Sequence, residues 1–140
     1  MVRHAEAEWS GSLKAGQGHV KVETGALDSP YTFRSRFEGG GETNPEELLG
    51  ASHAACFTMA LSAALTTAGH PPTNIKTTAA VTLTPVDGKP TITRIDLTTQ
   101  ASVPGIGDAT FQATAAEAKA GCPISRALAG TEIHLDAKLV

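Results

Sequence analysis

Alternation of polar and apolar positions predicts β-strands near both ends of the chain. Residues 19–23 alternate, and so do residues 31–37, where three aromatic side chains share one face and Arg34 and Arg36 lie on the other. The C-terminal residues 132–139 alternate almost without exception. A period of two is typical of a strand with one buried face, so we expect all three segments to be half-buried strands.

Two further strands are expected in the middle of the chain. Residues 76–86 and 91–103 are rich in threonine and valine, which favour extended backbone. The sequence Asp87-Gly88-Lys89-Pro90 separates them, and Asp-Gly between two such runs is a hairpin signal. The two segments are therefore expected to pair as a hairpin.

A long helix is expected over residues 44–69, because Gly69 with Pro71 and Pro72 beyond it is a helix-ending signal. In an unbroken helix Glu46 and Cys56 would lie about 15 Å apart along the axis, too far to share a site. A break at Gly50-Ala51-Ser52 would change this, since Gly50 would end a first helix and Ser52 would cap a second.

The apolar character of residues 51–65 bears on assembly. Nearly every side chain there is apolar or small, so the helix needs covering on all sides. Aromatic residues make up only 4% of the chain, so we expect its core to be built from Ala, Val, Leu and Ile. We therefore expect a partner subunit to help cover this helix, and we judge the run too short and too interrupted for a membrane span.

A third helical region precedes the last strand. Asp108 is a good N-cap, Phe111, Ala115 and Ala118 follow at helical spacing, and Gly121 is expected to supply the left-handed turn that ends the helix. Strands, a long helix, strands and then helices describe an α+β fold with antiparallel sheets. No repeat or linker divides residues 1–140, so we expect a single domain.

Charge and termini exclude several classes of function. A net charge of −3 with only 11 lysines and arginines gives no basic surface for nucleic acid or an anionic membrane. The N-terminus has no signal-peptide core, so we expect the protein to be cytoplasmic. Thiols in that compartment stay reduced unless they cycle, which counts against a permanent structural disulfide.

The two cysteines carry the candidate chemistry. Pro123 suits the first position of a helix, which puts Cys122 at the N-cap, where unpaired N–H groups and the helix dipole favour a thiolate. A tight corner with a small apolar side chain explains the same Gly-Cys-Pro sequence equally well. Cys56 and Cys122 are therefore either inert packing or a two-thiol redox centre, and we favour the redox centre.

The five histidines suggest two other chemistries. His53 and Cys56 are three residues apart and would share a helix face, as in a Cys-His nucleophile or half of a metal site. No CxxC is present, and no second histidine or carboxylate stands at ligand spacing beside them. We therefore expect no metal, and His53 is by default a capping or core residue.

Four motifs together resemble the OsmC/Ohr family: residues 32–39, 43–51, 53–57 and 118–123. The Asn-Pro-Glu to Ala-Ala-Cys-Phe block with a distant Gly-Cys-Pro is specific to that family, and the chain is most similar to its OsmC branch, the osmotically inducible peroxidases. The resemblance runs from about Glu8 to the C-terminus. It implies a thiol-dependent hydroperoxidase without a cofactor, built as an intertwined homodimer whose sheets enclose central helices.

The resemblance assigns roles to four residues. Cys56 matches the peroxide-attacking cysteine and Cys122 the resolving cysteine. Glu46, ten residues before Cys56, matches the family glutamate, and Arg36 in its Arg-Phe pair matches the arginine of the OsmC branch. The Ohr branch takes its arginine from a Gly-Arg segment nearer the N-terminus, where this chain has Leu-Lys-Ala-Gly at residues 13–16.

Two neighbours compete for these roles, Arg34 with Arg36 and, more weakly, Glu47 with Glu46.

In the implied reaction a thiolate attacks the peroxide, releases an alcohol and becomes a sulfenic acid, which the second thiol converts to a disulfide. The arginine would stabilise the thiolate and orient the peroxide, and the glutamate would hold the arginine. The resemblance suggests a dithiol as reductant, such as a lipoyl-bearing protein.

Phe57, Met59 and the surrounding Ala and Leu residues suggest an apolar approach to the sulfur, which favours organic hydroperoxides over hydrogen peroxide.

The helix-end argument makes Cys122 the more activated thiol, whereas the resemblance assigns the first attack to Cys56. We follow the resemblance, because Arg36 and Glu46 would activate Cys56, from the same chain or across the dimer.

Two functions of other kinds stay open. One is a stress-related binding or structural protein whose cysteines are inert core residues. The other is a thiol enzyme on the same fold that does not reduce peroxides.

Overall fold

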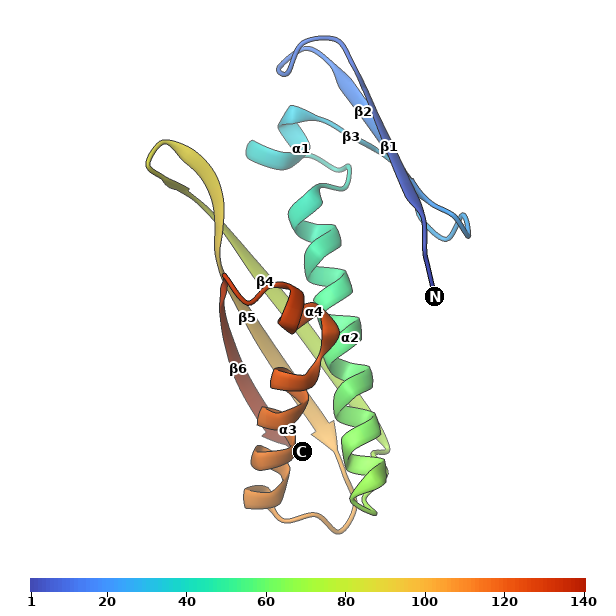
Figure 1. The fold of residues 1–140 in the computed structure, drawn as a ribbon, viewed down its shortest axis with the longest axis vertical. Helices are drawn as coiled ribbons and strands as arrows, with labels where there is room; N and C mark the ends of the chain where they lie inside the picture. The colour runs from blue at the N-terminus through green and yellow to red at the C-terminus, as the bar shows by residue number, and fades with distance from the viewer. The chain divides into compact units, whose positions relative to one another are not determined.

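The computed structural model describes residues 1–140 and contains two compact units, residues 1–48 and 49–140 (Figure 1). In the first unit, β1 (Ala5–Ser10), β2 (Gln17–Val22) and β3 (Asp28–Tyr31) form an antiparallel sheet in that order. The expected strand at residues 19–23 is confirmed as part of β2. A short helix, α1 (Phe33–Phe37), follows the sheet.

The expected strand over residues 31–37 is wrong beyond its first residue. Thr32 and Ser35 form a reciprocal capping box, in which each side chain accepts a hydrogen bond from the backbone N–H of the other at 3.0 Å, and such a box begins a helix. Phe33 and Phe37 then stack with ring centroids 4.9 Å apart. Their four-residue spacing satisfies a helical period as well as an alternating one, and the cap decides between them. Arg36 therefore lies on a helix.

The second unit is built on a three-stranded sheet, with β4 (Asn74–Val86), β5 (Lys89–Ser102) and β6 (Glu132–Leu139) in that order. The expected hairpin is confirmed: β4 and β5 are antiparallel, and Asp87 and Gly88 turn the chain with φ of 50° and 74°. β6 runs parallel to β5, so the sheets are antiparallel except at this pair. A parallel pair needs a crossover connection, which two helices supply here. The α+β class is confirmed.

The long helix α2 (Pro45–Thr67) has no break at Gly50. Gly50 is buried, and a Cβ placed on it would lie 3.4 Å from Cγ2 of Val81 on β4. The glycine therefore allows close packing of the helix on the sheet instead of ending a first helix. Gly69, with φ of 84°, follows the end of the helix as expected.

The crossover between β5 and β6 contains α3 (Asp108–Gly121) and α4 (Pro123–Ala127). Two details of the expected helix ends are wrong. Gly107 is the N-cap, and Asp108 is the first helical residue, where its charge suits the dipole. Gly121 stays helical, and the turn is made by Cys122, with φ of −58° and ψ of 123°.

The core of the second unit lies between one face of its sheet and the helices α2 and α3, which run along that face (Figure 1). It is built mainly from aliphatic side chains with two phenylalanines. Its fully packed members are Phe57, Leu61, Leu65, Ile95, Leu97, Ala101, Val103, Phe111, Ala115 and Ala118.

The two sides of α2 differ in exposure but not in polarity. Phe57, Leu61 and Leu65 are buried at four-residue spacing. The opposite side carries exposed Ala55, Met59 and Ala63, and Met59 is 74% exposed. By length and composition alone α2 is long and apolar enough to cross a membrane. The expectation that residues 51–65 are too short for a membrane span therefore does not hold for the whole helix. The core helix of a soluble protein passes the same test.

We predict that Leu61→Ala lowers the free energy of unfolding by about 2–5 kcal/mol, because it leaves a cavity in a fully packed core. Leu13→Ala is the matched control, since Leu13 is 65% exposed, and it should change stability by no more than about 0.5 kcal/mol. Urea denaturation at one fixed protein concentration measures both. Equal losses in the two variants would contradict the assignment of the core.

Candidate active site

Cys56 lies on α2 at the edge of the face that packs on the sheet. His53 and Phe57, on either side of it in the sequence, are fully buried, whereas Cys56 is half-buried. Cys56 is therefore not sealed inside the core of a single chain.

Cys122 lies at the corner between α3 and α4. It is both the residue that ends α3 and the N-cap of α4, and Pro123 occupies the first position of α4, as the sequence predicts. Proline there has no N–H to leave unpaired. The Cys122 side chain is 0% exposed, so the corner turns the thiol inward.

The fold brings the two sulfurs together across a separation of 66 residues. Sγ of Cys122 lies 2.6 Å from Sγ of Cys56, in direct contact, and no disulfide bond joins the two free thiols. Either sulfur can hold the proton that the two share. The pair is close enough for a bond between the sulfurs to form with little rearrangement of the backbone.

The surroundings shift the two thiols in opposite directions. Burial raises the pKa of Cys56, and the hydrogen bond to Cys122 raises it further. Burial acts on the pKa of Cys122 in the same sense, but interactions with Cys56, with Ser125 and with the backbone N–H of Ile124 outweigh it and lower that pKa. The Cys122 side chain makes no capping hydrogen bond to α4. Within one chain, Cys122 is thus the better thiolate.

His53 and Ser125 form a buried hydrogen bond next to the thiol pair. His53 Nε2 lies 2.8 Å from Oγ of Ser125, and His53 is 0% exposed. Burial lowers the pKa of His53, so the ring is neutral at pH 7. Ser125 was not predicted as a site residue. The one feature of the sequence that could have indicated it is its position three residues after Cys122, the N-cap of α4.

Arg36 and Glu46 form an ion pair within the first unit. Nη2 of Arg36 donates to Oε1 of Glu46 at 2.8 Å, and Nε lies 3.2 Å from each carboxylate oxygen. The Glu46 side chain is 11% exposed and that of Arg36 is 38% exposed. Such a forked contact fixes the plane of the guanidinium. Part of the Arg36 side chain stays free to bind another group.

The competing residues are placed differently. Arg34 is exposed. The carboxylate of Glu47 accepts a hydrogen bond from Oγ1 of Thr43 at 2.9 Å, while its backbone N–H donates to the Asn44 side chain. The structure therefore pairs Arg36 with Glu46 rather than with Glu47.

The structure thus brings the predicted residues together in two pairs, Cys56 with Cys122 and Arg36 with Glu46. Along the unbroken helix α2, the ten residues from Glu46 to Cys56 correspond to about 15 Å. The break at Gly50 that would have joined them within one chain is absent. His53 is turned toward Ser125, and no group of three or more His, Cys, Asp or Glu side chains is placed to hold a metal ion.

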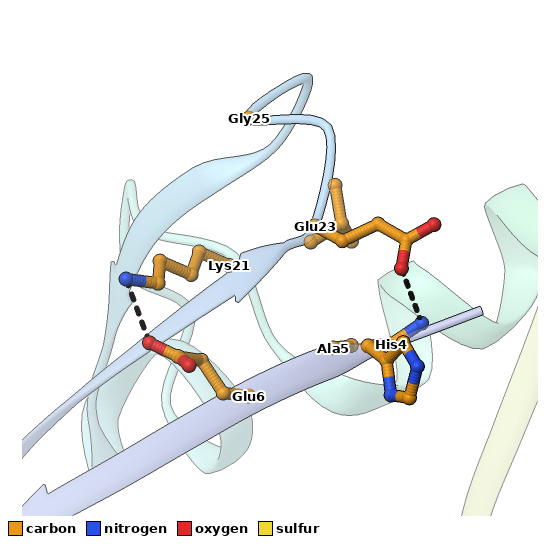
Figure 2. Close-up of a pocket in the computed structure, with 7 residues that line it drawn as sticks. His4, Ala5, Glu6, Lys21, Glu23 and Gly25 are labelled. Carbon is orange, nitrogen blue, oxygen red and sulfur yellow. Dashed lines mark hydrogen bonds and ion pairs between the residues drawn. The ribbon is translucent and has the colours of Figure 1, made fainter.

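A hollow in the first unit lies where β1 begins and β2 ends, and Figure 2 shows its charged groups facing one another. Nζ of Lys21 lies 2.7 Å from Oε1 of Glu6, and the backbone N–H of His4 donates to Oε2 of Glu23 at 3.0 Å. Its lining contains no thiol or hydroxyl side chain. We therefore assign the candidate active site to the thiol pair.

Comparisons with known proteins show which family the chain is similar to. The family described as OsmC-like protein matches residues 38–138. The chain is 51% identical over 138 residues to the Peroxiredoxin OsmC of Escherichia coli strain K12, covering 98% of this chain and 96% of the relative. The Peroxiredoxin OsmC of Shigella flexneri matches to the same extent.

Solved structures show the same fold. An organic hydroperoxide resistance protein from Elizabethkingia anophelis is 25% identical with a TM-score of 0.80, covering 100% of this chain and 99% of that one. An organic hydroperoxide resistance protein OsmC from Legionella pneumophila is 26% identical with a TM-score of 0.74, covering 96% of each chain. With the family match over most of its length and a relative at 51% identity, this chain belongs to the family of OsmC-like proteins.

Proposed function

We propose that this protein is a cysteine-based peroxidase that reduces organic hydroperoxides to alcohols. The observation that carries the proposal is the contact between two free sulfurs at 2.6 Å, which is the arrangement a dithiol needs to close a disulfide. The names of the relatives, a peroxiredoxin and organic hydroperoxide resistance proteins, support the same reaction and substrate class.

In this proposal Cys56 attacks the peroxide and Cys122 resolves the product. Exposure supports the order, because Cys56 is half-buried whereas Cys122 is fully buried, so a peroxide reaches Cys56 first. Attack by the Cys56 thiolate on the terminal oxygen releases an alcohol and leaves a sulfenic acid. Cys122 then displaces the hydroxyl group as water and forms the disulfide.

Cys56 needs help to ionise, because burial raises its pKa. A guanidinium close to the sulfur would stabilise the thiolate, and we assign this role to Arg36. Glu46 holds Arg36 through the forked contact and offsets the cost of removing its charge from water. Arg36 keeps donors that are free to orient the peroxide.

We further propose that Arg36 and Glu46 serve Cys56 of a partner subunit in a homodimer. Ten residues of helix, about 15 Å along its axis, separate Glu46 from Cys56 of the same chain, which favours a site completed by a second chain. The exposed apolar side of α2, with Met59 at its centre, favours a second chain as its cover. In such a dimer residues 1–140 act as one functional domain.

The remaining assignments follow from the same chemistry. We place the reaction in the cytoplasm, with a dithiol such as a lipoyl-bearing protein as reductant of the Cys56–Cys122 disulfide. We assign no nucleic-acid or membrane partner, since the net charge is −3. The proposed reaction uses no cofactor, because the two thiols themselves supply the electrons that reduce the peroxide.

Single substitutions of the cysteines test the roles. Cys56→Ser should abolish turnover, whereas Cys122→Ser should still permit one attack, after which the unresolved sulfenic acid over-oxidises. Trapping with a sulfenic-acid reagent after one equivalent of peroxide should label Cys122→Ser and not Cys56→Ser. Labelling of Cys122 in the Cys56→Ser variant, with full reactivity kept, would reverse the two roles. No reaction in either variant or in the parent protein would favour inert core cysteines.

Substrate preference is the second test. Phe57 is fully buried and does not line the approach to Cys56 as the sequence suggests, so the apolar surface must come from other groups, including Met59. Cumene hydroperoxide should have at least about a tenfold higher kcat/KM than hydrogen peroxide, since apolar burial contributes roughly 0.8 kcal/mol per methylene-sized group. Steady-state assays with a dithiol reductant measure both. Equal kcat/KM values for the two peroxides would contradict an apolar approach to Cys56.

Complementation tests whether the site is shared. Inactive Cys56→Ser and inactive Arg36→Ala chains, unfolded together and refolded, form heterodimers in which one pocket carries both lesions and the other is intact. Random pairing should restore roughly a quarter of the parent activity if Arg36 acts across the interface. A mixture that stays inactive would place Arg36 in the site of its own chain. Glu46→Ala in place of Arg36→Ala tests the carboxylate separately.

A further inference from the structure

Next to the thiol pair lies a buried hydrogen bond that the proposed reaction does not use. It joins His53 to Ser125, the third residue of α4, and Cys122 is the N-cap of the same helix. His53 and Cys122 are both 0% exposed and Ser125 is 8% exposed. Nε2 of His53 lies 2.8 Å from the Ser125 hydroxyl oxygen. The lowered pKa of Cys122, to which Ser125 contributes, agrees with a nearby hydroxyl.

The burial of His53 determines where its proton lies. Nδ1 of His53 is buried and has no hydrogen-bond partner. An unpaired buried N–H donor is rarer in proteins than an under-used acceptor, so the favoured tautomer carries the proton on Nε2. The ring then donates to Oγ of Ser125, and the Ser125 proton is free to point at sulfur.

We propose that His53 is a positioning residue for the resolving step: its Nε2–H holds the Ser125 hydroxyl so that this hydroxyl donates to the Cys122 sulfur and stabilises the Cys122 thiolate. The inference rests on the proposed peroxidase function for its role in turnover. The hydrogen bond between His53 and Ser125 is a property of the resting protein.

The step balances without an added reactant. The S–H proton of Cys122 moves to the hydroxyl oxygen of the Cys56 sulfenic acid, and the Cys122 sulfur uses the freed electron pair to bond the Cys56 sulfur. The S–O bond of the sulfenic acid breaks, its electron pair stays on oxygen, and water leaves. Ser125 stabilises the negative charge that builds on the Cys122 sulfur, and His53 stays neutral throughout.

The groups that act on Cys122 come from two helices packed against it. Cys56 contacts it from α2, and Ser125 and the backbone N–H of Ile124 contact it from α4. On the flanking residues, the ammonium of Lys119 donates to the carbonyl of Ile133, and Arg126 is exposed. The Ser125 hydroxyl is therefore the side-chain donor whose removal isolates the effect.

The test titrates the Cys122 thiolate in a Cys56→Ser background, by the ultraviolet absorbance of the thiolate as a function of pH. This measurement needs neither peroxide nor access of a reagent to the buried sulfur. Ser125→Ala and His53→Met should each lower the thiolate fraction at a fixed pH about 3- to 10-fold, as expected for one lost hydrogen bond. His53→Gln should keep the parent value, because its amide places a donor near the Nε2 position.

Thr99→Val is the matched control, since it removes a hydroxyl that is 0% exposed elsewhere in the same unit. It should leave the titration unchanged. Circular dichroism checks that each variant is folded. If His53→Met does not fold, the titrations of Ser125→Ala and His53→Gln still test the role of the Ser125 hydroxyl.

A titration unmoved by Ser125→Ala would overturn the inference, as would His53→Gln behaving like His53→Met. In the protein with both cysteines, His53→Met should slow disulfide formation and leave sulfenic-acid formation unchanged. A protein that shows the titration shifts but consumes no peroxide would keep the link from His53 through Ser125 to Cys122 and refute only the peroxidase function.

Discussion

The contact between the sulfurs of Cys56 and Cys122 is the feature on which the rest of the structure depends. Neither residue reaches the other through local sequence. Cys56 is held in place because Phe57 and its neighbours pack α2 on the sheet, with Gly50 allowing the close approach. Cys122 is held because the corner between α3 and α4 turns its side chain inward. The core therefore serves chiefly to fix one short distance.

Burial holds the two thiols together, and it also disfavours the thiolate form of each. It raises the pKa of Cys56, while nearby donors lower that of Cys122. A chain that attacks with Cys56 thus needs a positive charge from elsewhere, and the guanidinium held by Glu46 is the candidate. The same electrostatics suits Cys122 to its proposed role, because a resolving thiol must ionise while still shielded from peroxide.

Much of the fold was predictable because its periodic segments are long. The hairpin of β4 and β5, the last strand and the extent of α2 all follow from pattern and turn residues. Residues 31–37 were predicted as a strand because phenylalanines four residues apart fit both a strand and a helix. The capping box of Thr32 and Ser35 favours the helix that the structure shows. The pairing of Cys56 with Cys122 was favoured from the two cysteine motifs, and the family resemblance then gave each cysteine its role. The link from His53 to Ser125 spans 72 residues that no spacing rule connects.

The central claim is that the two thiols form one redox centre. Its most direct test is the intact mass of the reduced protein after one equivalent of cumene hydroperoxide, measured without reductant. The account predicts a loss of two hydrogens per chain, no free thiols, and a peptide that joins Cys56 to Cys122. An unchanged mass with both thiols still free would contradict it.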